Sequence, residues 1–319
     1  MSMEKRELIY EGKAKRVYAT DQPGQVIQEF KDEATAFDGK KRGVIAGKGK
    51  VNAQMSDIIF RYLEKHGIHT HHVKLISENE LLTWWLEMIP VEIIVRNYAA
   101  GSLAKRLGYP ERTEMKSPIV EYYYKNDELG DPMLAREHIR ELGLASDEQL
   151  DEMTSIALRV NEILRPFFEA RGIILADFKL EFGLREGRIL LGDEFSPDVC
   201  RLWDAETGEI MDKDRFRRDL GKVEETYAEV LRRVSEEQAG VAASVYVSPK
   251  KGVLDPAGQA TLGALKSLGY EEVREVRIGK YITLRLEGVE ADKAEERVRE
   301  MCERLLANPI IEDYRVEID

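Results

Sequence analysis

The chain has 319 residues, of which 43% are hydrophobic and 34% are charged, and its formal net charge is −12. This composition is typical of a soluble globular protein with room for two domains, and because neither part of the chain is basic overall, it argues against nucleic-acid binding. No apolar run approaches the roughly 20 residues that cross a membrane. The two cysteines, Cys200 and Cys302, are far apart in the sequence and fit reduced thiols in the cytoplasm.

The first part of the chain mixes short strand-like runs with helical patterns. The apolar spacing predicts, in chain order, strands at residues 8–10, 16–19 and 26–30, a glycine-rich basic segment at 38–50, a helix at 55–63, a strand at 90–95, a helix at 147–170, a strand hairpin at 175–194 and a helix at 214–237.

The period of the pattern changes near residues 237–240. The remaining elements are predicted as a strand at 241–247, a helix at 255–268, strands at 273–278 and 281–286, a helix at 292–306 and a strand at 314–318. This β-α-β-β-α-β order is the split-βαβ pattern. We therefore expect two domains, at residues 1–238 and 239–319.

The strand predicted at residues 175–183 is the most informative stretch. Three charged residues alternate there with three apolar ones: Asp177, Lys179 and Glu181 with Phe178, Leu180 and Phe182. Because alternate side chains of a strand share a face, one face carries a carboxylate, an ammonium and a second carboxylate, while the other anchors the strand in a core. Charges are rarely placed in such a row beside a core unless they bind something.

The chain then returns as a hairpin, whose register decides where Asp193 lies. We expect a three-residue loop at residues 186–188, with Arg185 paired to Ile189. This register sets Glu181 directly opposite Asp193. Two facing carboxylates repel unless a cation lies between them, and Mg²⁺ takes one or two carboxylates together with phosphate oxygens. The alternative is a hairpin with a solvated charged face, and a one-residue slip would move Asp193 to the other face.

Two further pairs of residues are candidates for anion binding. Lys13 and Lys15 follow Gly12 in a turn and could reach one polyphosphate, although the turn is not a Walker sequence and a solvated turn is the alternative. Arg96 and Ser102 bracket a glycine-containing bend. An arginine beside a hydroxyl suits a carboxylate or a phosphate, and a purely structural role is the alternative.

Asp198 and Arg201 follow the hairpin directly. They either pair with each other or face a ligand beside Asp193, and their position favours the ligand. The sequence also holds a group of histidines at positions 66, 69, 71 and 72. Their spacing matches no standard zinc pattern and neither cysteine is near, so neutral structural histidines are the favoured interpretation.

Together these residues resemble one enzyme family. Its two signatures are similar to residues 89–102, IPVEIIVRNYAAGS, and residues 175–183, LADFKLEFG, and residues 11–16, 192–198 and 201–203 match as well. The family is phosphoribosylaminoimidazole-succinocarboxamide synthase, or SAICAR synthetase. The resemblance implies an α+β fold with two kinase-like lobes, at about residues 1–87 and 88–238.

The resemblance also implies a reaction and a role for each matched residue. L-Aspartate would be joined to carboxyaminoimidazole ribonucleotide while ATP is converted to ADP and phosphate. The implied roles are ATP contacts for Lys13, Ala14, Lys15, Glu87, Met88 and Lys125; Mg²⁺ ligands for Glu181 and Asp193; substrate contacts for Asp38, Arg96, Ser102, Asp198 and Arg201; and catalytic roles for Lys179 and for Asp177, which would orient Lys179 or accept a proton.

The last 80 residues resemble a different family. Residues 247–250, 253–256, 277–281, 305–308 and 311–315 are similar to the small subunit of formylglycinamide ribonucleotide amidotransferase, or FGAM synthase. The chain thus resembles a fusion of two purine-biosynthesis proteins. The second is implied to be a non-catalytic assembly subunit that forms homo-oligomers and binds the large and glutaminase subunits.

The competing class is a small-molecule kinase of related fold, followed by a regulatory module that binds a small ligand. The Asp177-x-Lys179 spacing is similar to that of inositol-phosphate kinases, but the sequence has no H-R-D-type catalytic loop. Release of ADP that depends on aspartate separates the two classes.

Overall fold

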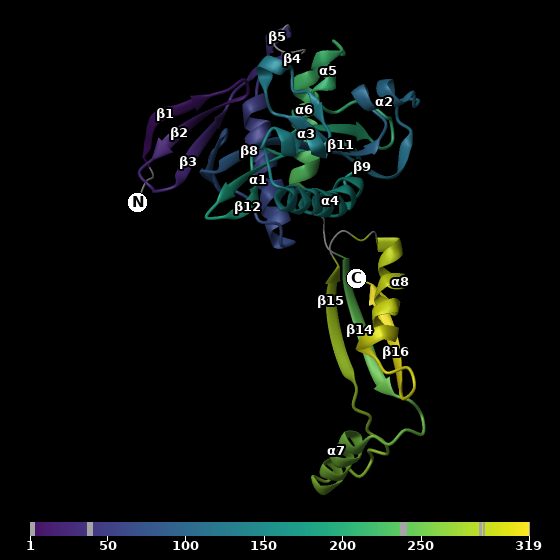
Figure 1. Ribbon diagram of the computed structural model, residues 1–319. Coiled ribbons are helices and arrows are strands. Elements are labelled where there is room, and N and C mark those ends of the chain that lie inside the picture. Colours follow the sequence, from purple (N-terminus) through teal and green to yellow (C-terminus); the bar gives the residue numbers. More distant parts are fainter. Residues whose placement is uncertain (1–3, 37–40, 237–240, 287–288, 290, 319) are drawn as a thin grey trace. The chain divides into compact units, whose positions relative to one another are not determined.

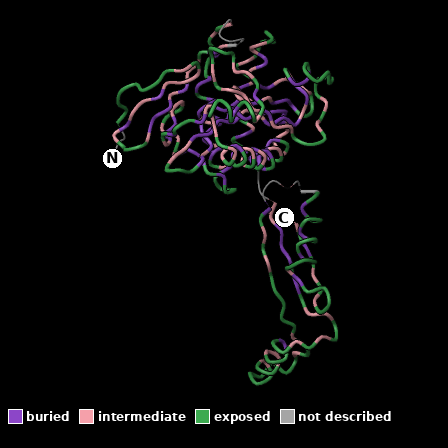
Figure 2. The backbone as a smooth tube through the Cα atoms, viewed as in Figure 1, coloured by how far each residue is buried: buried purple, intermediate pink, exposed green. Residues whose placement is uncertain are grey.

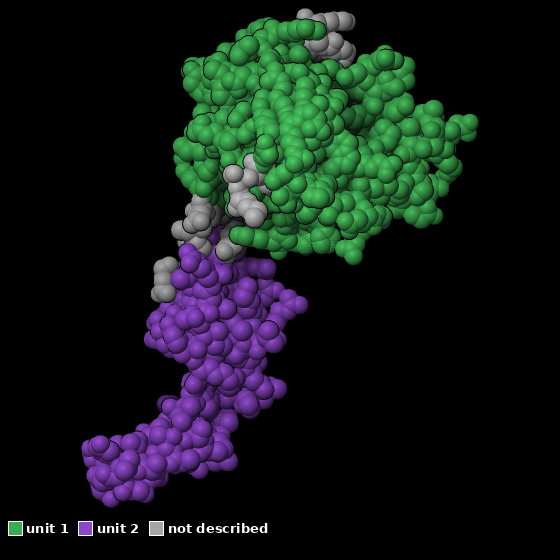
Figure 3. Space-filling model, turned by 90° about the vertical axis from the view of Figure 1, so that its left-hand side faces the viewer, with its two compact units in different colours: residues 1–236 green, residues 237–319 purple. Residues whose placement is uncertain are grey.

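Residues 4–36, 41–236, 241–286, 289 and 291–318 are described by the computed structural model. Contacts along the chain divide it into two units, Met1–Glu236 and Glu237–Asp319 (Figure 3). No helix in the described ranges is long and apolar enough to cross a membrane.

The first unit begins with a five-stranded antiparallel sheet in the order β1-β2-β3-β7-β6 (Figure 1). Its strands are β1 (Lys5–Glu11), β2 (Lys15–Thr20), β3 (Gln25–Phe30), β6 (His72–Ser77) and β7 (Glu80–Trp84), and a hairpin of β4 (Glu33–Ala36) and β5 (Lys41–Val44) follows β3. Helix α1 (Lys48–Lys65) packs on this sheet, where Ala53 joins Phe30 and Leu81 in a small core.

A second sheet forms the centre of the first unit. Its order is β10-β9-β8-β11-β12, and β13 also pairs with β11. The strands are β8 (Glu87–Tyr98), β9 (Glu114–Tyr124), β10 (Met133–Leu134), β11 (Ile173–Arg185), β12 (Arg188–Leu191) and β13 (Cys200–Asp204). The antiparallel register of β8 and β11 sets Arg96 opposite Asp177 and Glu92 opposite Glu181. Charged side chains from two strands therefore meet on one face.

The other face of β11 anchors the main core, as the alternation predicts. Phe178, Leu180 and Phe182 belong to one buried cluster with apolar residues of α4, including Leu164. Figure 2 shows that buried residues gather in the middle of the first unit. The helices of this unit after α1 are α2 (Gly101–Leu107), a 3₁₀ turn at Asp127–Leu129, α3 (Arg136–Glu141), α4 (Asp147–Glu169), α5 (Asp214–Arg217) and α6 (Val223–Ser235).

The predicted register of the hairpin is wrong. Arg185 pairs with Arg188, not Ile189, and the loop holds only residues 186 and 187. Both loop residues have positive φ, 53° at Glu186 and 78° at Gly187, which is the backbone of the two-residue turns that match the twist of paired strands. The carbonyl of Glu181 consequently accepts a hydrogen bond from the amide of Gly192, at 2.9 Å, and Asp193 lies beyond the end of β12.

Two predicted helices also have different bounds. The helix expected at 214–237 is broken into α5 and α6, because φ is positive at Asp219, Gly221 and Lys222. The Arg215 side chain holds this break by donating to the carbonyl of Gly221, at 2.9 Å. The helix expected at 55–63 begins earlier, at Lys48, and includes Gly49. A Cβ on Gly49 would lie 2.5 Å from the carbonyl oxygen of Phe30, so this glycine serves close packing.

The second unit has a three-stranded sheet in the order β15-β14-β16. Its elements are β14 (Val241–Pro249), α7 (Pro256–Ser267), β15 (Lys280–Leu286), α8 (Ala291–Met301), a π turn at Cys302–Leu306 and β16 (Glu312–Ile318). The apolar side chains of β14 pack against α8, with Val245 and Val298 fully buried.

One strand of the second unit differs from the prediction. Residues 273–278 were expected to form a strand, but no strand is assigned to them. Asp255 caps α7 by accepting from the amide of Gly258 at 2.9 Å, and its second oxygen accepts from the amide of Ile278, also at 2.9 Å. An amide that binds this cap is not available to a sheet ladder. The α+β class and the β-α-β-β-α-β-like order are otherwise confirmed.

Candidate active site

A cleft of about 1420 Å³ lies in the first unit, lined by residues of both of its large sheets. A site for one small molecule usually encloses roughly 300–1,000 Å³, so this cleft has room for a nucleotide and a second ligand. The predicted site residues that line it are Lys13, Ala14, Lys15, Glu87, Met88, Arg96, Ser102, Lys125, Asp177, Lys179, Glu181, Asp193, Asp198 and Arg201. Asp38 lies outside the described residues.

Lysines and carboxylates form one group of charges in the cleft. The ammonium of Lys15 donates to Oδ1 of Asp193 at 2.6 Å, and that of Lys179 donates to Oε1 of Glu181 at 2.8 Å. Lys125 donates to the other oxygen of Glu181. Burial alone would raise the pKa of both carboxyl groups, but the lysine charges outweigh it, so the pKa of Glu181 and that of Asp193 lie below their ordinary values. Both groups are therefore ionised at neutral pH.

The two carboxylates suit a divalent cation that also binds phosphate. Both carboxylates line the same cleft, although they are not ladder partners. Among the described residues there is no group of three or more His, Cys, Asp or Glu side chains that could hold a metal. Mg²⁺ needs only one or two carboxylates when phosphate oxygens and water complete its shell. The donor set thus fits Mg²⁺ bound together with a polyphosphate.

The backbone at Asp193 turns this carboxylate away from the ladder. Its φ is 61°, in the left-handed region, directly after Leu191 and Gly192 end the β12 segment. The segment before β6 supports the turn, because the amide of His71 donates to the carbonyl of Leu191 at 2.9 Å. Burial, with the nearby charge of Lys15, lowers the pKa of His71 to about 3, so its ring is neutral.

The other histidine of this segment has a structural partner. Nε2 of His72 lies 2.8 Å from Oδ1 of Asp57 in α1. Together with the neutral ring of His71, this contact agrees with the structural interpretation of the histidines.

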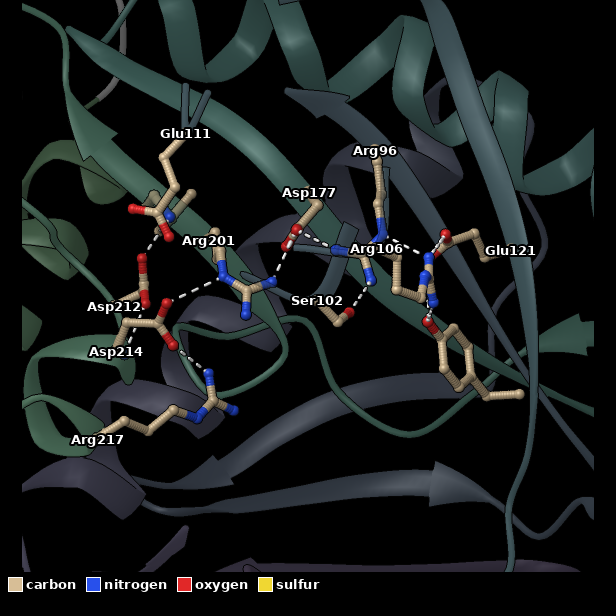
Figure 4. Close-up of polar contacts among 12 residues, drawn as sticks. Arg96, Ser102, Arg106, Glu111, Glu121, Asp177, Arg201, Asp212, Asp214 and Arg217 are labelled. Atoms are coloured by element: carbon tan, nitrogen blue, oxygen red, sulfur yellow. Dashed lines mark hydrogen bonds and ion pairs between the residues drawn. The ribbon is translucent and has the colours of Figure 1, made fainter. Parts of the chain in front are cut away.

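Two arginines and a carboxylate form a second group of charges (Figure 4). Arg96 and Arg201 both donate through Nη1 to Oδ2 of Asp177, at 2.8 and 2.7 Å. Nη2 of Arg96 also donates to Oγ of Ser102, at 3.3 Å. Asp177 is thus ion-paired with the arginines, and its carboxylate is not hydrogen-bonded to Lys179. This arrangement presents guanidinium groups suited to a phosphate or a carboxylate.

Asp198 is the centre of a third, buried group. Its carboxylate accepts from Lys48 and Lys213, both at 3.1 Å, and from the hydroxyl of Tyr227 at 2.8 Å. Burial would raise the pKa of Asp198, but Lys213 and Lys48 lower it below its usual range. The alternative interpretation, in which Asp198 pairs with Arg201, is not supported by these contacts.

The residues predicted to contact the nucleotide come from three segments. The turn after β1 carries Lys13, which is exposed and donates to Asp127 at 2.7 Å. The first residues of β8, Glu87 and Met88, pair with Leu184 and Gly183 of β11. Lys125 follows the end of β9.

Sequence reasoning missed several cleft residues. Glu92 accepts from Lys179 at 2.6 Å, and Glu194 lies 3.6 Å from Lys15. Glu92 lies within the 89–102 motif between the buried Val91 and Ile93, so its alternation with these apolar residues was an available signal. Lys48, the partner of Asp198, could be recognised only as one of several basic residues in the glycine-rich segment.

Comparison with known proteins gives a family for each part of the chain. The SAICAR synthetase family model matches residues 8–234. The family model described as phosphoribosylformylglycinamidine (FGAM) synthase matches residues 242–319. These matches confirm the two resemblances predicted from the sequence.

Relatives and solved structures match the first unit over nearly their whole length. The phosphoribosylaminoimidazole-succinocarboxamide synthase of Coprothermobacter proteolyticus is 57% identical over 233 residues, which are 73% of this chain and 99% of that protein. The enzyme of the same name from Ehrlichia chaffeensis has a solved structure that matches with a TM-score of 0.70 and 45% identity, over 72% of this chain and 98% of that chain. A structure of SAICAR synthetase in complex with ADP matches with a TM-score of 0.70 and 51% identity, over 72% of this chain and 97% of that chain.

Proposed function

The chain belongs to the SAICAR synthetase family, and from this premise we propose that its first unit joins L-aspartate to carboxyaminoimidazole ribonucleotide at the expense of ATP. The observation that carries the proposal is one cleft that combines an ionised carboxylate pair with lysines and a two-arginine anion site. A relative that is 51% identical binds ADP, which supports the use of a nucleotide here.

The chemistry follows from the weakness of a carboxylate as an acyl donor. Transfer of the γ-phosphoryl group of ATP to the carboxylate of the ribonucleotide forms a mixed anhydride and releases ADP. The amine of aspartate then attacks the carbonyl carbon, the C–O bond to the phosphoryl group breaks, and phosphate leaves as the amide forms. The task of the protein in such a transfer is positioning and charge stabilisation.

The lysine and carboxylate group fits the phosphate end of ATP. Glu181 and Asp193 would hold Mg²⁺, which when bound neutralises charge that develops on the phosphates. Lys15 and Lys125 orient the two carboxylates and supply positive charge to the phosphate oxygens. Lys179, which is bound between Glu92 and Glu181, is the residue that we place at the phosphoryl group in transfer.

The remaining nucleotide contacts are proposed by position. Lys13 and Ala14 in the turn after β1 would cover the phosphates, and Glu87 with Met88 would flank the adenine.

The arginine group fits the acidic substrates. Arg96, Arg201 and Ser102 would bind the phosphate of the ribonucleotide, since a planar guanidinium donates two hydrogen bonds to such a group. Asp177, between the two arginines, is proposed to hold them in place. Asp198 and Asp38 complete the substrate contacts that the family resemblance implies.

The second unit is proposed to act in assembly. Its family match supports a role as a subunit of FGAM synthase, with the large and glutaminase subunits as partners and homo-oligomers as the free form. We propose residues 1–238 and 239–319 as the two functional domains.

An assay of ADP release with and without aspartate tests the proposal. With carboxyaminoimidazole ribonucleotide, ATP and Mg²⁺ present, ADP should form at a rate that depends on aspartate, and the product should carry the succinyl group by mass spectrometry. A kinase of related fold would instead release ADP without aspartate and phosphorylate its substrate stably. That result would overturn the proposal.

A further inference from the structure

The guanidinium of Arg96 is fixed on two of its edges. Its Nε donates to Oε2 of Glu121 at 2.6 Å, and its Nη1 donates to Oδ2 of Asp177 at 2.8 Å. The side chains of Arg96 and Glu121 are each 3% exposed. A guanidinium held on two edges cannot rotate without breaking a buried, charge-assisted hydrogen bond. Only the Nη2 group is left to face the cleft, where it meets Ser102.

Arg201 is held in the same way from the other side (Figure 4). Its Nε donates to Oδ2 of Asp214 at 3.0 Å, and its Nη1 donates to Asp177 at 2.7 Å. Its Nη2 lies close to Gly101, since a Cβ added there would be 2.6 Å away. The Nη2 groups of the two arginines therefore both lie beside the Gly101–Ser102 segment, and Asp177 is the shared partner between them.

Asp214 is itself held in position. Its amide donates to Oδ1 of Asp212 at 2.7 Å, and the other oxygen of Asp212 accepts from the amide of Leu202 at 2.8 Å. Leu202 is the neighbour of Arg201 in β13. Asp214, which holds the guanidinium of Arg201, is thus connected through Asp212 to β13, the strand that carries Arg201.

Two outer arginines complete the charge balance of this network. Arg106 donates to Glu121, and Arg217 donates to Oδ1 of Asp214 at 2.5 Å. The alternating series is Arg106, Glu121, Arg96, Asp177, Arg201, Asp214 and Arg217. Three carboxylates beside two arginines would carry a net negative charge and repel an anion. With the outer arginines the series holds four arginines and three carboxylates, and Arg218 lies 3.8 Å from Asp214 as well, so positive charge exceeds negative charge in the series.

We propose that Glu121 and Asp214 are positioning residues, which aim the Nη2 groups of Arg96 and Arg201 at the phosphate monoester of the nucleotide substrate. Arg106 and Arg217 keep the site attractive to an anion by neutralising the outer carboxylates. The proposal rests on the function proposed above and adds to it the side chains that act through the substrate-binding arginines. These four residues act on substrate affinity and take no part in the phosphoryl transfer.

The test compares Glu121→Gln and Asp214→Asn in the full-length chain. Each change keeps the shape of the side chain but removes the charge that fixes one guanidinium. The KM for the ribonucleotide should rise roughly tenfold or more, the size expected from losing one hydrogen bond to a charged group. The kcat should fall less than about threefold, and the KM for ATP should not move. Ribose 5-phosphate, used as a competitive inhibitor, should lose affinity by the same factor.

Glu162→Gln is the matched control. Glu162 is exposed and pairs with Arg159 at 2.8 Å within α4, and neither residue belongs to the alternating series or lines the cleft, so the kinetics of this variant should equal those of the parent. Asp214→Glu, which restores the charge, should recover a large part of the affinity. A purely structural role would instead lower kcat and raise the KM for ATP together.

The outcomes distinguish failure of the proposed function from failure of the proposed positioning role. If the parent protein shows no aspartate-dependent ADP release, the proposed function falls. If the parent is active but both variants keep its KM for the ribonucleotide, the function stands and the positioning role is overturned. If circular dichroism shows that one variant does not fold, the other variant tests the positioning role on the opposite side of Asp177. Arg106→Gln, at an exposed residue, is a further variant in which the KM for the ribonucleotide should rise.

Discussion

The two units bury different kinds of side chain. The first buries ionisable groups from several elements, and several of them, including Glu92, Arg96 and Glu181, line the cleft. In the described part of the second unit, Ser244 is the one polar residue among the buried side chains. Its core is a small apolar cluster of β14 and α8. The first unit therefore buries both charged and apolar side chains, whereas the core of the second is almost entirely apolar.

The difference reflects what each unit has to bind. Taking a charge out of water is unfavourable unless partners compensate it, so clustered buried charges are expected where a charged ligand is held. Both units expose large apolar side chains, but the three most exposed among the described residues, Leu268, Leu305 and Ile310, at 74%, 83% and 82%, belong to the second unit. Exposed apolar surface favours association with other proteins. Buried charge thus distinguishes the first unit, and the exposed apolar side chains of the second agree with the assembly role that we propose for it.

The largest effect is expected at Glu181 and Asp193, the carboxylates that we propose bind Mg²⁺ in the first unit. Glu181→Gln or Asp193→Asn should lower turnover about 10²-fold or more while the fold is kept, because each removes one charge that would stabilise Mg²⁺ and phosphate in the transition state. The measurement is aspartate-dependent ADP release, with circular dichroism as the check on folding. Near-normal turnover of both variants at saturating Mg²⁺ would show that these buried charges do not hold the metal.

A second test asks whether a buried charge also stabilises the fold. Lys48→Met should lower the free energy of unfolding by about 2 kcal/mol, because it leaves Asp198 with only Lys213 and Tyr227 as partners. Lys50→Met, in the same helix, is the control. Lys50 is exposed and pairs with Glu78 at the surface, so its loss should change stability by less than about 0.5 kcal/mol. Equal effects in urea unfolding would contradict the distinction.

The pH dependence of stability gives a smaller effect. Burial, together with the charge of Asp214, raises the pKa of Asp212 to about 7, well above the ordinary range of an aspartate. Between about pH 4 and about pH 7, Asp212 therefore keeps a proton in the folded chain that it has lost in the unfolded chain. The stabilising contribution is complete below about pH 4 and disappears as the pH rises through 7, by about 1.4 kcal/mol between about pH 6 and about pH 8.

Asp212→Ala checks this sign. The difference in unfolding free energy between the parent and the variant should shrink by that amount over the same pH range. Parallel curves for the two proteins would mean that Asp212 titrates at its ordinary pKa.

The smallest expected effect is that of removing the second unit. A chain that ends at Gln238 should keep synthase activity within a few-fold, because every described residue that lines the cleft belongs to the first unit. Residues 240–319 alone should form homo-oligomers, show no activity of their own and restore amidotransferase activity to the large and glutaminase subunits. Loss of synthase turnover in a truncated protein that is still folded would show that the second unit is needed for synthase activity.

Local alternation made much of the site predictable from the sequence. The charged face of β11 and the motif around Arg96 identify residues that the fold brings into one cleft. For β11 the strand period was enough, because the burial of Phe178, Leu180 and Phe182 places the charged residues together on the other face. Helix α4 was equally accessible, since its apolar stripe is long and uninterrupted.

The errors arose where a backbone choice or a distant partner decides the structure. The hairpin loop depends on residues 186 and 187 both adopting positive φ, which a three-residue loop does not require. The break between α5 and α6 depends on the Arg215 contact with the Gly221 carbonyl. The partners of Asp198 lie up to 150 positions away, at Lys48. Spacing within one segment carries no information on such contacts.

The two-faced strand β11 also constrains how this sequence can change through evolution. A single-residue insertion or deletion between Asp177 and Glu181 would exchange the faces of every residue beyond it, carrying charges into the core and phenylalanines into the cleft. Fold and catalysis would be lost in the same step, with no intermediate that keeps either. The strand can therefore vary only by replacement in place.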